Sequence, residues 1–299
     1  MKIKAWIQAF RLRTLPLAFS CIFMGAFTAG IDGYFQADIL TWSLITTLFL
    51  QILSNLANDY GDASSGVDGD HRTGPKRTVS SGLITKGQMK NALITFSLLS
   101  LGSGLYLVWL SFGDQWAKVL VFIALGLGAI AAAIKYTVGS RPYGYAGLGD
   151  FFVLVFFGLV GVGGNYFLYT STLDAWVLLP ALSCGFLAVG VLNVNNIRDI
   201  ESDKASGKYS IPVRIGRKNA VYYHWFLIGG AIAAMLGFCL LKDLGAGAYL
   251  FLLVTPILFF NARAVKIKQT SEGLDPYLKQ LALTTLLFVL LFGFGEQLF

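Results

Sequence analysis

Two short stretches of the sequence concentrate carboxylate and amide side chains, SNLANDYGDASSG and LNVNNIRDIESD. Asn58 and Asp62 are four residues apart, and the same spacing separates Asn195, Asp199 and Asp203 in turn. Residues four apart lie on one face of a helix, so each stretch is predicted to present oxygen ligands to one site on a helix that continues past the membrane boundary. We call Asn58, Asp59 and Asp62 the first acidic motif, and Asn195, Asp199 and Asp203 the second acidic motif.

Carboxylates this close together repel one another, which raises their pKa values unless a cation or a hydrogen-bond donor lies among them. Mg²⁺ suits such hard oxygen ligands, because it is held by one or two carboxylates together with water and phosphate oxygens. The candidate metal ligands are Asp59, Asp62, Asp68, Asp199 and Asp203. A calcium loop starting at Asp62 is excluded, because its sixth position is Val67 and its twelfth is Thr73. Solvated loop charges remain the alternative.

The loops around these motifs also carry groups that could bind a phosphorylated substrate. Candidate substrate ligands there are Asn58, Arg72, Lys76 and Arg77 in the first loop, and Asn195 and Lys208 in the second, with His71, Lys204, Arg214 and Arg217 nearby. A third loop, KYTVGSRPYGYAGLGD, offers Lys135 and Arg141 as phosphate or carboxylate partners and Tyr136 as a neighbour for a cation. An ordinary turn between helices remains the alternative for that loop.

The elements that must position these residues are membrane helices. A helix needs roughly 20 apolar residues to cross the hydrocarbon layer, and the chain is 56% hydrophobic and only 13% charged. Nine runs free of charge meet or approach that length, which predicts an all-α, polytopic membrane bundle of nine transmembrane helices. The runs are Thr14–Ile31, Ile39–Asn58, Asn91–Gly113, Val119–Ile134, Phe151–Leu173, Ala175–Ile197, Asn219–Leu241, Leu244–Ala262 and Gln280–Gly295.

Basic residues fix the expected orientation, since Lys and Arg gather in cytoplasmic loops. With the N-terminus inside, all of the 23 basic residues except Lys118 and Lys242 fall on the cytoplasmic side. This topology accounts for the net charge of +7, so no nucleic-acid partner is expected. The two polar loops, about 59–90 and 198–218, then lie on the same side, and their acidic motifs can face each other. No long linker divides the chain, so residues 1–299 are expected to form one domain.

Smaller features are interpreted as structural. Cys21, Cys184 and Cys239 fall inside expected spans without metal-ligand spacing and are expected to be packing residues. His224, in YYHW, is expected to pack at the interface. Repeated glycines, as in GLVGVGG, are expected to let membrane helices approach closely.

At the acidic motifs the sequence resembles the UbiA superfamily of intramembrane prenyltransferases, whose two Asp-rich motifs end helices two and six and hold Mg²⁺ and a prenyl diphosphate. RTGPKR, YTVGSRPYGYAGLGD and NNIRDI are similar to the menaquinone branch of that superfamily, and the likeness spans nearly the whole chain. The superfamily pattern Asn-x3-Asp-x3-Asp is altered here, because Gly66 replaces its last aspartate and Asp68 follows two residues later. Either Asp59 or Asp68 could complete the first metal site.

The resemblance implies Mg²⁺-dependent transfer of a polyprenyl group from its diphosphate to 1,4-dihydroxy-2-naphthoate, giving demethylmenaquinone, CO₂ and diphosphate. It implies catalytic roles for Asp62, Asp199, Asp203 and Lys135, and a place in the bacterial cytoplasmic (inner) membrane with the active site on the cytoplasmic side. Another aromatic acceptor, such as 4-hydroxybenzoate, is the alternative within the superfamily. A transporter is the rival class, although transporters place such polar groups nearer the bilayer midplane.

Overall fold

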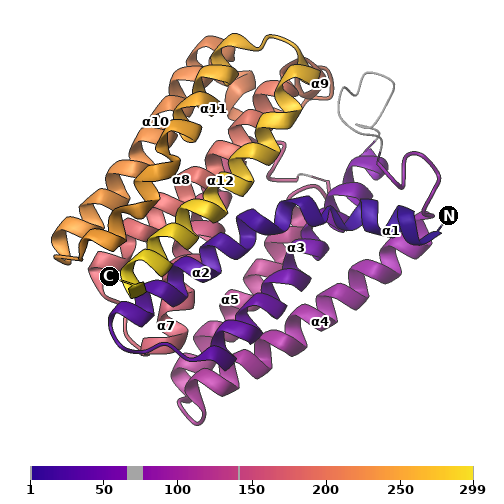
Figure 1. Ribbon diagram of the computed structural model, residues 1–299. Coiled ribbons are helices and arrows are strands. Elements are labelled where there is room, and N and C mark those ends of the chain that lie inside the picture. The colour runs from indigo at the N-terminus through magenta and orange to yellow at the C-terminus, as the bar shows by residue number, and fades with distance from the viewer. Residues whose placement is uncertain (1, 66–76, 141, 299) are drawn as a thin grey trace.

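The computed structural model describes residues 2–65, 77–140 and 142–298, and these residues form helices and connecting loops without a strand (Figure 1). The first half of the chain contains α1 (Lys2–Phe10), η1 (Leu12–Thr14), α2 (Leu15–Ile31), α3 (Ala37–Ser65), α4 (Lys86–Phe112) and α5 (Trp116–Lys135). The middle contains α6 (Gly149–Val153), η2 (Leu154–Gly164), α7 (Asn165–Thr170) and η3 (Ala175–Val177). The remainder contains α8 (Leu178–Arg198), α9 (Ile200–Ala205), α10 (Ile211–Leu241), η4 (Ala246–Val254), α11 (Thr255–Ile267) and α12 (Ser271–Leu298).

Nine helical segments within the described part of the chain are long and apolar enough to cross a membrane. They run over Ile3–Ile31, Ala37–Ser64, Lys86–Phe112, Trp116–Lys135, Gly149–Thr170, Ala175–Arg198, Ile211–Leu241, Ala246–Ile267 and Ser271–Glu296. Each contains or overlaps one of the nine runs expected from the sequence. The prediction of an all-α, multi-pass membrane bundle is confirmed.

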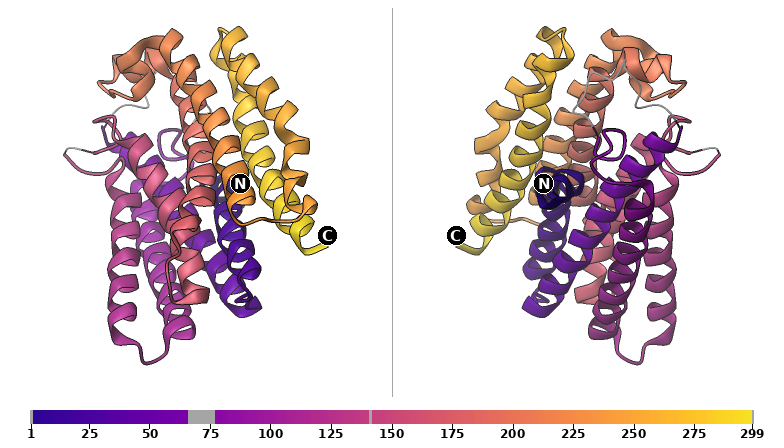
Figure 2. Two further views of the ribbon diagram at one scale, coloured as in Figure 1. Left: turned by 90° about the vertical axis from the view of Figure 1, so that its left-hand side faces the viewer. Right: turned by 90° about the vertical axis from the view of Figure 1, so that its right-hand side faces the viewer.

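The helices pack as two groups around separate apolar cores (Figure 2). One core joins α8, α10, α11 and α12, with Met24 of α2 and Phe238 of α10 fully buried in it. The other joins α1, α3, α4 and α5 around Leu53 and Met89. Helix α2 contacts α3, α8, η2 and α12. The two groups therefore meet along α2 and η2.

Small residues let the middle of the chain approach α8 closely. The segment η2 is a wide π-helical stretch, LVFFGLVGVGG. A Cβ atom added to Gly158 would lie 2.7 Å from the carbonyl oxygen of Ala181 and 3.2 Å from Cα of Gly185. This contact confirms the expectation that glycines serve helix packing here. Cys21, Cys184 and Cys239 are buried and free, as expected for packing residues.

His224 differs from the expectation of interfacial packing. It is fully buried among helices, and its Nε2 lies 3.2 Å from Oδ1 of Asn261. Asn261 donates in turn to the carbonyl of Tyr277 and to Gln280. Hydropathy around YYHW could not reveal this contact, because the partner Asn261 comes from another helix, α11.

One polar cluster joins three elements at the end of the bundle remote from the acidic motifs. Lys242, just after α10, pairs with Asp32 at the end of α2 (3.1 Å) and with Asp174 before η3 (3.3 Å). The hydroxyl of Tyr166 donates to the other oxygen of Asp32 at 2.7 Å. Burial lowers the pKa of Lys242, but the hydrogen bonds to Asp32 and Asp174 raise it more, so its pKa is raised overall.

Candidate active site

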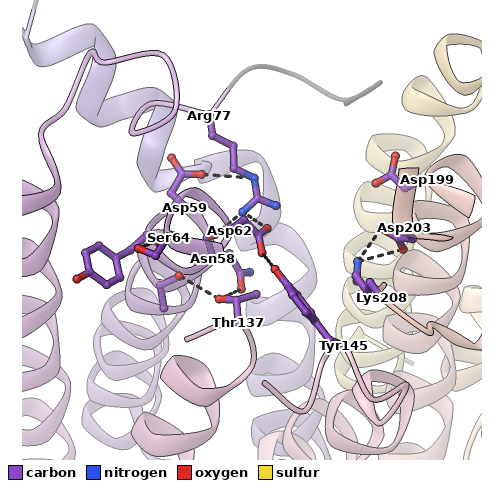
Figure 3. Close-up of polar contacts among 12 residues, drawn as sticks. Asn58, Asp59, Asp62, Ser64, Arg77, Thr137, Tyr145, Asp199, Asp203 and Lys208 are labelled. Carbon is purple, nitrogen blue, oxygen red and sulfur yellow. Dashed lines mark hydrogen bonds and ion pairs between the residues drawn. The ribbon is translucent and has the colours of Figure 1, made fainter. Parts of the chain in front are cut away.

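Both acidic motifs line one cavity of about 1020 Å³. Its walls include residues of α3, the loop after α5, α8, α9 and α12, and they include all six residues of the two motifs: Asn58, Asp59, Asp62, Asn195, Asp199 and Asp203. Figure 3 shows the first motif across from Asp199 and Asp203. The structure therefore brings together two sets of residues that are far apart in the sequence.

Asp62, in the last turns of α3, is held on both carboxylate oxygens. Its Oδ2 pairs with Nη1 of Arg77, and its Oδ1 accepts a hydrogen bond of 2.5 Å from the hydroxyl of Tyr145 (Figure 3). The same Arg77 nitrogen donates to the carbonyl of Asn58. Arg77 thus lies at the first acidic motif, where the sequence predicted a substrate ligand, and Asp62 is buried with a cation at its side.

Asp59 has a different environment from Asp62, although the two are one helical turn apart. Its Oδ1 accepts from Nη2 of Arg11 at 2.6 Å, and its Oδ2 accepts from the amide (3.1 Å) and the hydroxyl (2.7 Å) of Thr78. Asp59 is 1% exposed. Its carboxylate therefore joins the N-terminal arm and the segment at Thr78 to α3, and this arrangement argues against the metal-ligand role predicted for it.

A contact with the loop after α5 fixes the end of α3. The hydroxyl of Thr137 donates to the carbonyl of Ala57 at 3.0 Å and lies 3.3 Å from Oδ1 of Asn58. Gly61 faces the same residue, and a Cβ atom added there would lie 2.6 Å from the carbonyl oxygen of Thr137. The helix can approach Thr137 only because position 61 has no side chain.

The second acidic motif corrects one expectation, because it does not lie on a continuous helix. Helix α8 ends at Arg198 and α9 starts at Ile200, with Asp199 between them at φ −101° and ψ 11°. At this break Arg198 donates from Nε and Nη2 to both oxygens of Asp199, at 2.8 and 2.7 Å. Asp199 still lines the cavity.

Arg198 also holds the surroundings of Asp199 in place. Its Nη2 donates to Oδ1 of Asn195 at 2.9 Å, and its Nη1 donates to Asp275 of α12 at 2.7 Å. No role was predicted for Arg198. Its place next to Asp199 in the sequence could have indicated a contact with that carboxylate. Its contact with Asp275 could not have been predicted, because the two residues are far apart in the sequence.

Asp203 is 6% exposed and pairs with Lys208, whose Nζ lies 3.1 and 3.2 Å from its two oxygens. Ser210 donates to Oδ2 at 3.4 Å. Burial raises the pKa of Asp203, and the neighbouring Lys208 opposes that rise. Lys208 therefore lies where a substrate-binding cation was predicted, at the second acidic motif.

Of the residues predicted for the site around the end of α5, Tyr136 lines the cavity and Lys135 does not. Tyr136 lines the cavity, and burial raises its pKa, with the carboxylates of Asp150, Asp203 and Asp62 adding to the rise, so its phenol stays protonated. Lys135 is exposed and is not among the cavity-lining residues, because the helix turns its neighbour Tyr136 inward instead. The predicted catalytic role of Lys135 is not supported by this placement.

Several predicted residues lie outside the described part of the chain: Asp68, His71, Arg72, Lys76 and Arg141. Two further basic residues have structural partners. Arg214 donates to the carbonyls of Ala146 (2.6 Å) and Tyr209 (3.0 Å), and Arg217 donates to the carbonyl of Lys268. These two arginines hold loops together in this structure.

The donor set fits a divalent cation of the Mg²⁺ type. Carboxylate oxygens from two facing motifs border one cavity, whose basic residues could bind the phosphates that usually complete the shell of Mg²⁺. Among the described residues no three carboxylates form a preassembled cluster. Mg²⁺ in proteins commonly takes its remaining ligands from water and from substrate phosphates.

Comparison with known proteins agrees with this geometry. The model of the UbiA prenyltransferase family matches residues 18–294. The chain belongs to this family. The family assignment made from the acidic motifs is thereby confirmed, and the protein is a prenyltransferase by family.

Two curated relatives extend the match over nearly the whole chain. A 1,4-dihydroxy-2-naphthoate octaprenyltransferase of Escherichia coli is 45% identical over 293 residues, which are 97% of this chain and 95% of the relative. The protein of the same name from Haemophilus influenzae is 42% identical over 297 residues, covering 98% and 96%.

Solved structures of the UbiA family share the fold. The apo structure of a homologue from Aeropyrum pernix K1 has a TM-score of 0.72 at 16% identity and covers 96% of this chain and 97% of its own. A homologue from Archaeoglobus fulgidus, solved with GPP and Mg²⁺, has a TM-score of 0.61 at 17% identity and covers 95% and 98%. The UbiA-like fold prediction is confirmed.

Proposed function

We propose that this UbiA-family protein transfers a polyprenyl group from polyprenyl diphosphate to 1,4-dihydroxy-2-naphthoate, with a divalent metal ion, Mg²⁺, as cofactor. The bond between the prenyl C1 and the diphosphate oxygen breaks, and its electron pair leaves with diphosphate. A carbon–carbon bond forms between C1 and the acceptor ring, and the acceptor carboxylate is lost as CO₂. The products are the quinol form of demethylmenaquinone, which keeps the two hydroxyl groups of the acceptor, CO₂ and diphosphate.

One observation carries this proposal: carboxylates from two distant parts of the chain border a single cavity that continues between apolar helices. A substrate with a diphosphate head and an apolar tail has matching chemistry. Leu101, Leu105, Phe122 and Leu125 line the apolar part of the cavity, where the tail would be buried.

In this proposal Asp62, Asp199 and Asp203 hold the metal, with Asp68 as a further candidate from the loop. Mg²⁺, when bound, supplies positive charge that stabilises the departing diphosphate. Arg77 and Lys208 now neutralise Asp62 and Asp203. They can turn their donors to the diphosphate once those carboxylates have another cation.

The cavity walls then protect the allylic cation from water. Tyr136, Tyr143, Phe152 and Phe156 line the cavity, and aromatic faces stabilise a nearby cation. The rings of Tyr143 and Phe152 lie 4.1 Å apart between centroids. Such a wall favours attack by the electron-rich acceptor ring over attack by water.

Support for the acceptor comes from the two curated relatives, which are named for 1,4-dihydroxy-2-naphthoate and cover nearly the whole chain. Support for the location comes from the basic loops, which favour an inner-membrane protein whose N-terminus and cavity mouth face the cytoplasm. In this proposal residues 1–299 act as one catalytic unit.

The test is an assay of purified protein with a radiolabelled prenyl diphosphate and two acceptors, 1,4-dihydroxy-2-naphthoate and 4-hydroxybenzoate. We expect a prenylated naphthalene product, release of CO₂, and loss of both in excess EDTA with recovery on adding Mg²⁺. Prenylation of 4-hydroxybenzoate alone would assign the other acceptor class. Full turnover in EDTA would contradict the metal-dependent reaction.

A further inference from the structure

Tyr145 contacts the first acidic motif with its side chain and the segment that follows Lys208 with its backbone. Its side chain reaches the first acidic motif, where the hydroxyl donates to Oδ1 of Asp62 at 2.5 Å. Its carbonyl accepts from the amide of Tyr209, at 2.9 Å, in the segment that directly follows Lys208. Figure 3 shows the ring between Asp62 and the Asp203–Lys208 pair.

The hydrogen bond to Asp62 has the length of a charge-assisted one. Bonds between a hydroxyl and a carboxylate anion measure about 2.5–2.7 Å, shorter than bonds between neutral groups. The phenol therefore makes a short, well-defined bond to the Asp62 carboxyl group. This leaves the carboxylate in one orientation, with Arg77 on its other oxygen.

The backbone around Tyr145 is itself held firmly. Arg214 donates to the carbonyls of Ala146 and Tyr209, so one guanidinium group joins the two loop segments that meet there. Gly147 follows with φ +75°, and a Cβ atom added to it would lie 2.4 Å from the carbonyl oxygen of Tyr209. A ring carried on so constrained a loop can set the position of its partner carboxylate.

From these contacts we infer that Tyr145 is a positioning residue: it orients Asp62 for the divalent metal and links the first acidic motif to the segment at Tyr209, which directly follows Lys208. Carboxylates that bind metals are commonly held by such hydrogen bonds, and loss of the partner costs about 10–100-fold in metal affinity or activity. The inference rests on the proposed function, because it assigns Asp62 to the metal.

The experiment measures metal binding without turnover. Wild-type protein and Tyr145→Phe are purified in detergent and titrated with Mn²⁺ in the presence of geranyl thiolodiphosphate, which cannot ionise at the reacting bond. Free Mn²⁺ is followed by electron paramagnetic resonance. We expect the dissociation constant for Mn²⁺ to rise by about 10-fold or more in Tyr145→Phe.

The matched control is Tyr166→Phe, which removes the same kind of bond, from a tyrosine hydroxyl to Asp32, at the remote end of the bundle. It should bind Mn²⁺ as wild type does, even if both variants lose thermal stability. A second variant, Arg214→Gln, keeps the hydroxyl but frees the loop, and a rise of a few fold in the Mn²⁺ dissociation constant is expected.

Two results would overturn the inference, and they differ in meaning. Wild-type affinity for Mn²⁺ in both Tyr145→Phe and Arg214→Gln overturns the positioning role alone. Failure of the wild-type protein to bind Mn²⁺ with the analogue overturns the proposed metal-dependent function, and this inference with it.

Discussion

At the scale of single residues, neighbouring aspartates of the first acidic motif have separate tasks. Asp59 is surrounded by donors from Arg11 and Thr78, which come from two other segments of the chain. Asp62 lines the cavity between Arg77 and Tyr145. Both aspartates line the cavity and join segments of the chain, but Asp59 accepts three hydrogen bonds from Arg11 and Thr78, whereas Asp62 is held by Arg77 and Tyr145.

This difference predicts distinct outcomes for two substitutions. Asp59→Asn weakens a buried ion pair and should lower the free energy of unfolding by about 1–3 kcal/mol, with a smaller effect on turnover. Asp62→Asn also weakens a buried ion pair, with Arg77, so it should lower stability by a similar amount, but in addition it should reduce kcat by about 100-fold or more. Thermal unfolding in detergent and the prenyl-transfer assay, run on both variants, check this. Equal losses of turnover with unchanged stability would contradict it.

The acidic motifs themselves could be predicted from the sequence, because i, i+4 spacing at a helix end is a local pattern. Their partners could not. Arg11 contacts Asp59 and Tyr145 contacts Asp62 across long sequence separations, and spacing within one helix carries no information about such contacts. The exposure of Lys135 could not be predicted either. Neighbouring residues of a helix point in different directions, and the sequence does not tell which of Lys135 and Tyr136 faces the cavity.

At the scale of elements, the close approach of α3 to the loop after α5 positions the first motif. Gly61 lies against Thr137, whose hydroxyl donates to the carbonyl of Ala57. Membrane helices approach closely where small residues face each other. The length and order of the nine spans followed from hydropathy, whereas hydropathy carries no sign of the break at Asp199 or of the π-helical form of η2.

Gly61→Ala tests this packing. The added methyl group would meet Thr137 at 2.6 Å, and overpacking of this kind costs about 1–3 kcal/mol. We expect a lower melting temperature and a higher KM for prenyl diphosphate, because the turn that carries Asn58 and Asp62 must shift. The control is Gly102→Ala in α4, where a Cβ atom meets nothing within 4 Å. Wild-type stability and KM in Gly61→Ala would refute the argument.

At the scale of the whole molecule, polar contacts join the elements at both ends of an apolar bundle. The acidic motifs and their basic partners lie at one end, and Lys242 with Asp32 and Asp174 lies at the other. The second cluster connects the ends of α2 and α10 with the segment before η3. It therefore ties the middle of the chain to the α8–α12 group.

Lys242→Met should lower the free energy of unfolding by about 0.2–1 kcal/mol, since the group is partly exposed and such pairs are screened. The pKa of Lys242 is raised in the folded state, so its contribution is fully present below the unfolded pKa of about 10.4. The stability difference from wild type should stay constant from about pH 6 to about pH 9, because this range lies below the unfolded pKa of about 10.4, and should shrink as the pH rises further. Melting temperatures across this range check it, and a difference that grew with rising pH would contradict the pairing.

The central claim is that two acidic motifs from distant parts of the chain hold one metal–diphosphate complex. Electron–nuclear double resonance of Mn²⁺ with geranyl thiolodiphosphate tests this directly. A strong coupling between phosphorus and Mn²⁺ is seen only when an oxygen of the diphosphate binds the metal. We expect a phosphorus coupling in wild-type protein that is lost in Asp62→Asn and, separately, in Asp203→Asn. If either single variant kept the wild-type coupling and Mn²⁺ occupancy, one motif would suffice to hold the complex, and the two-motif site would be wrong.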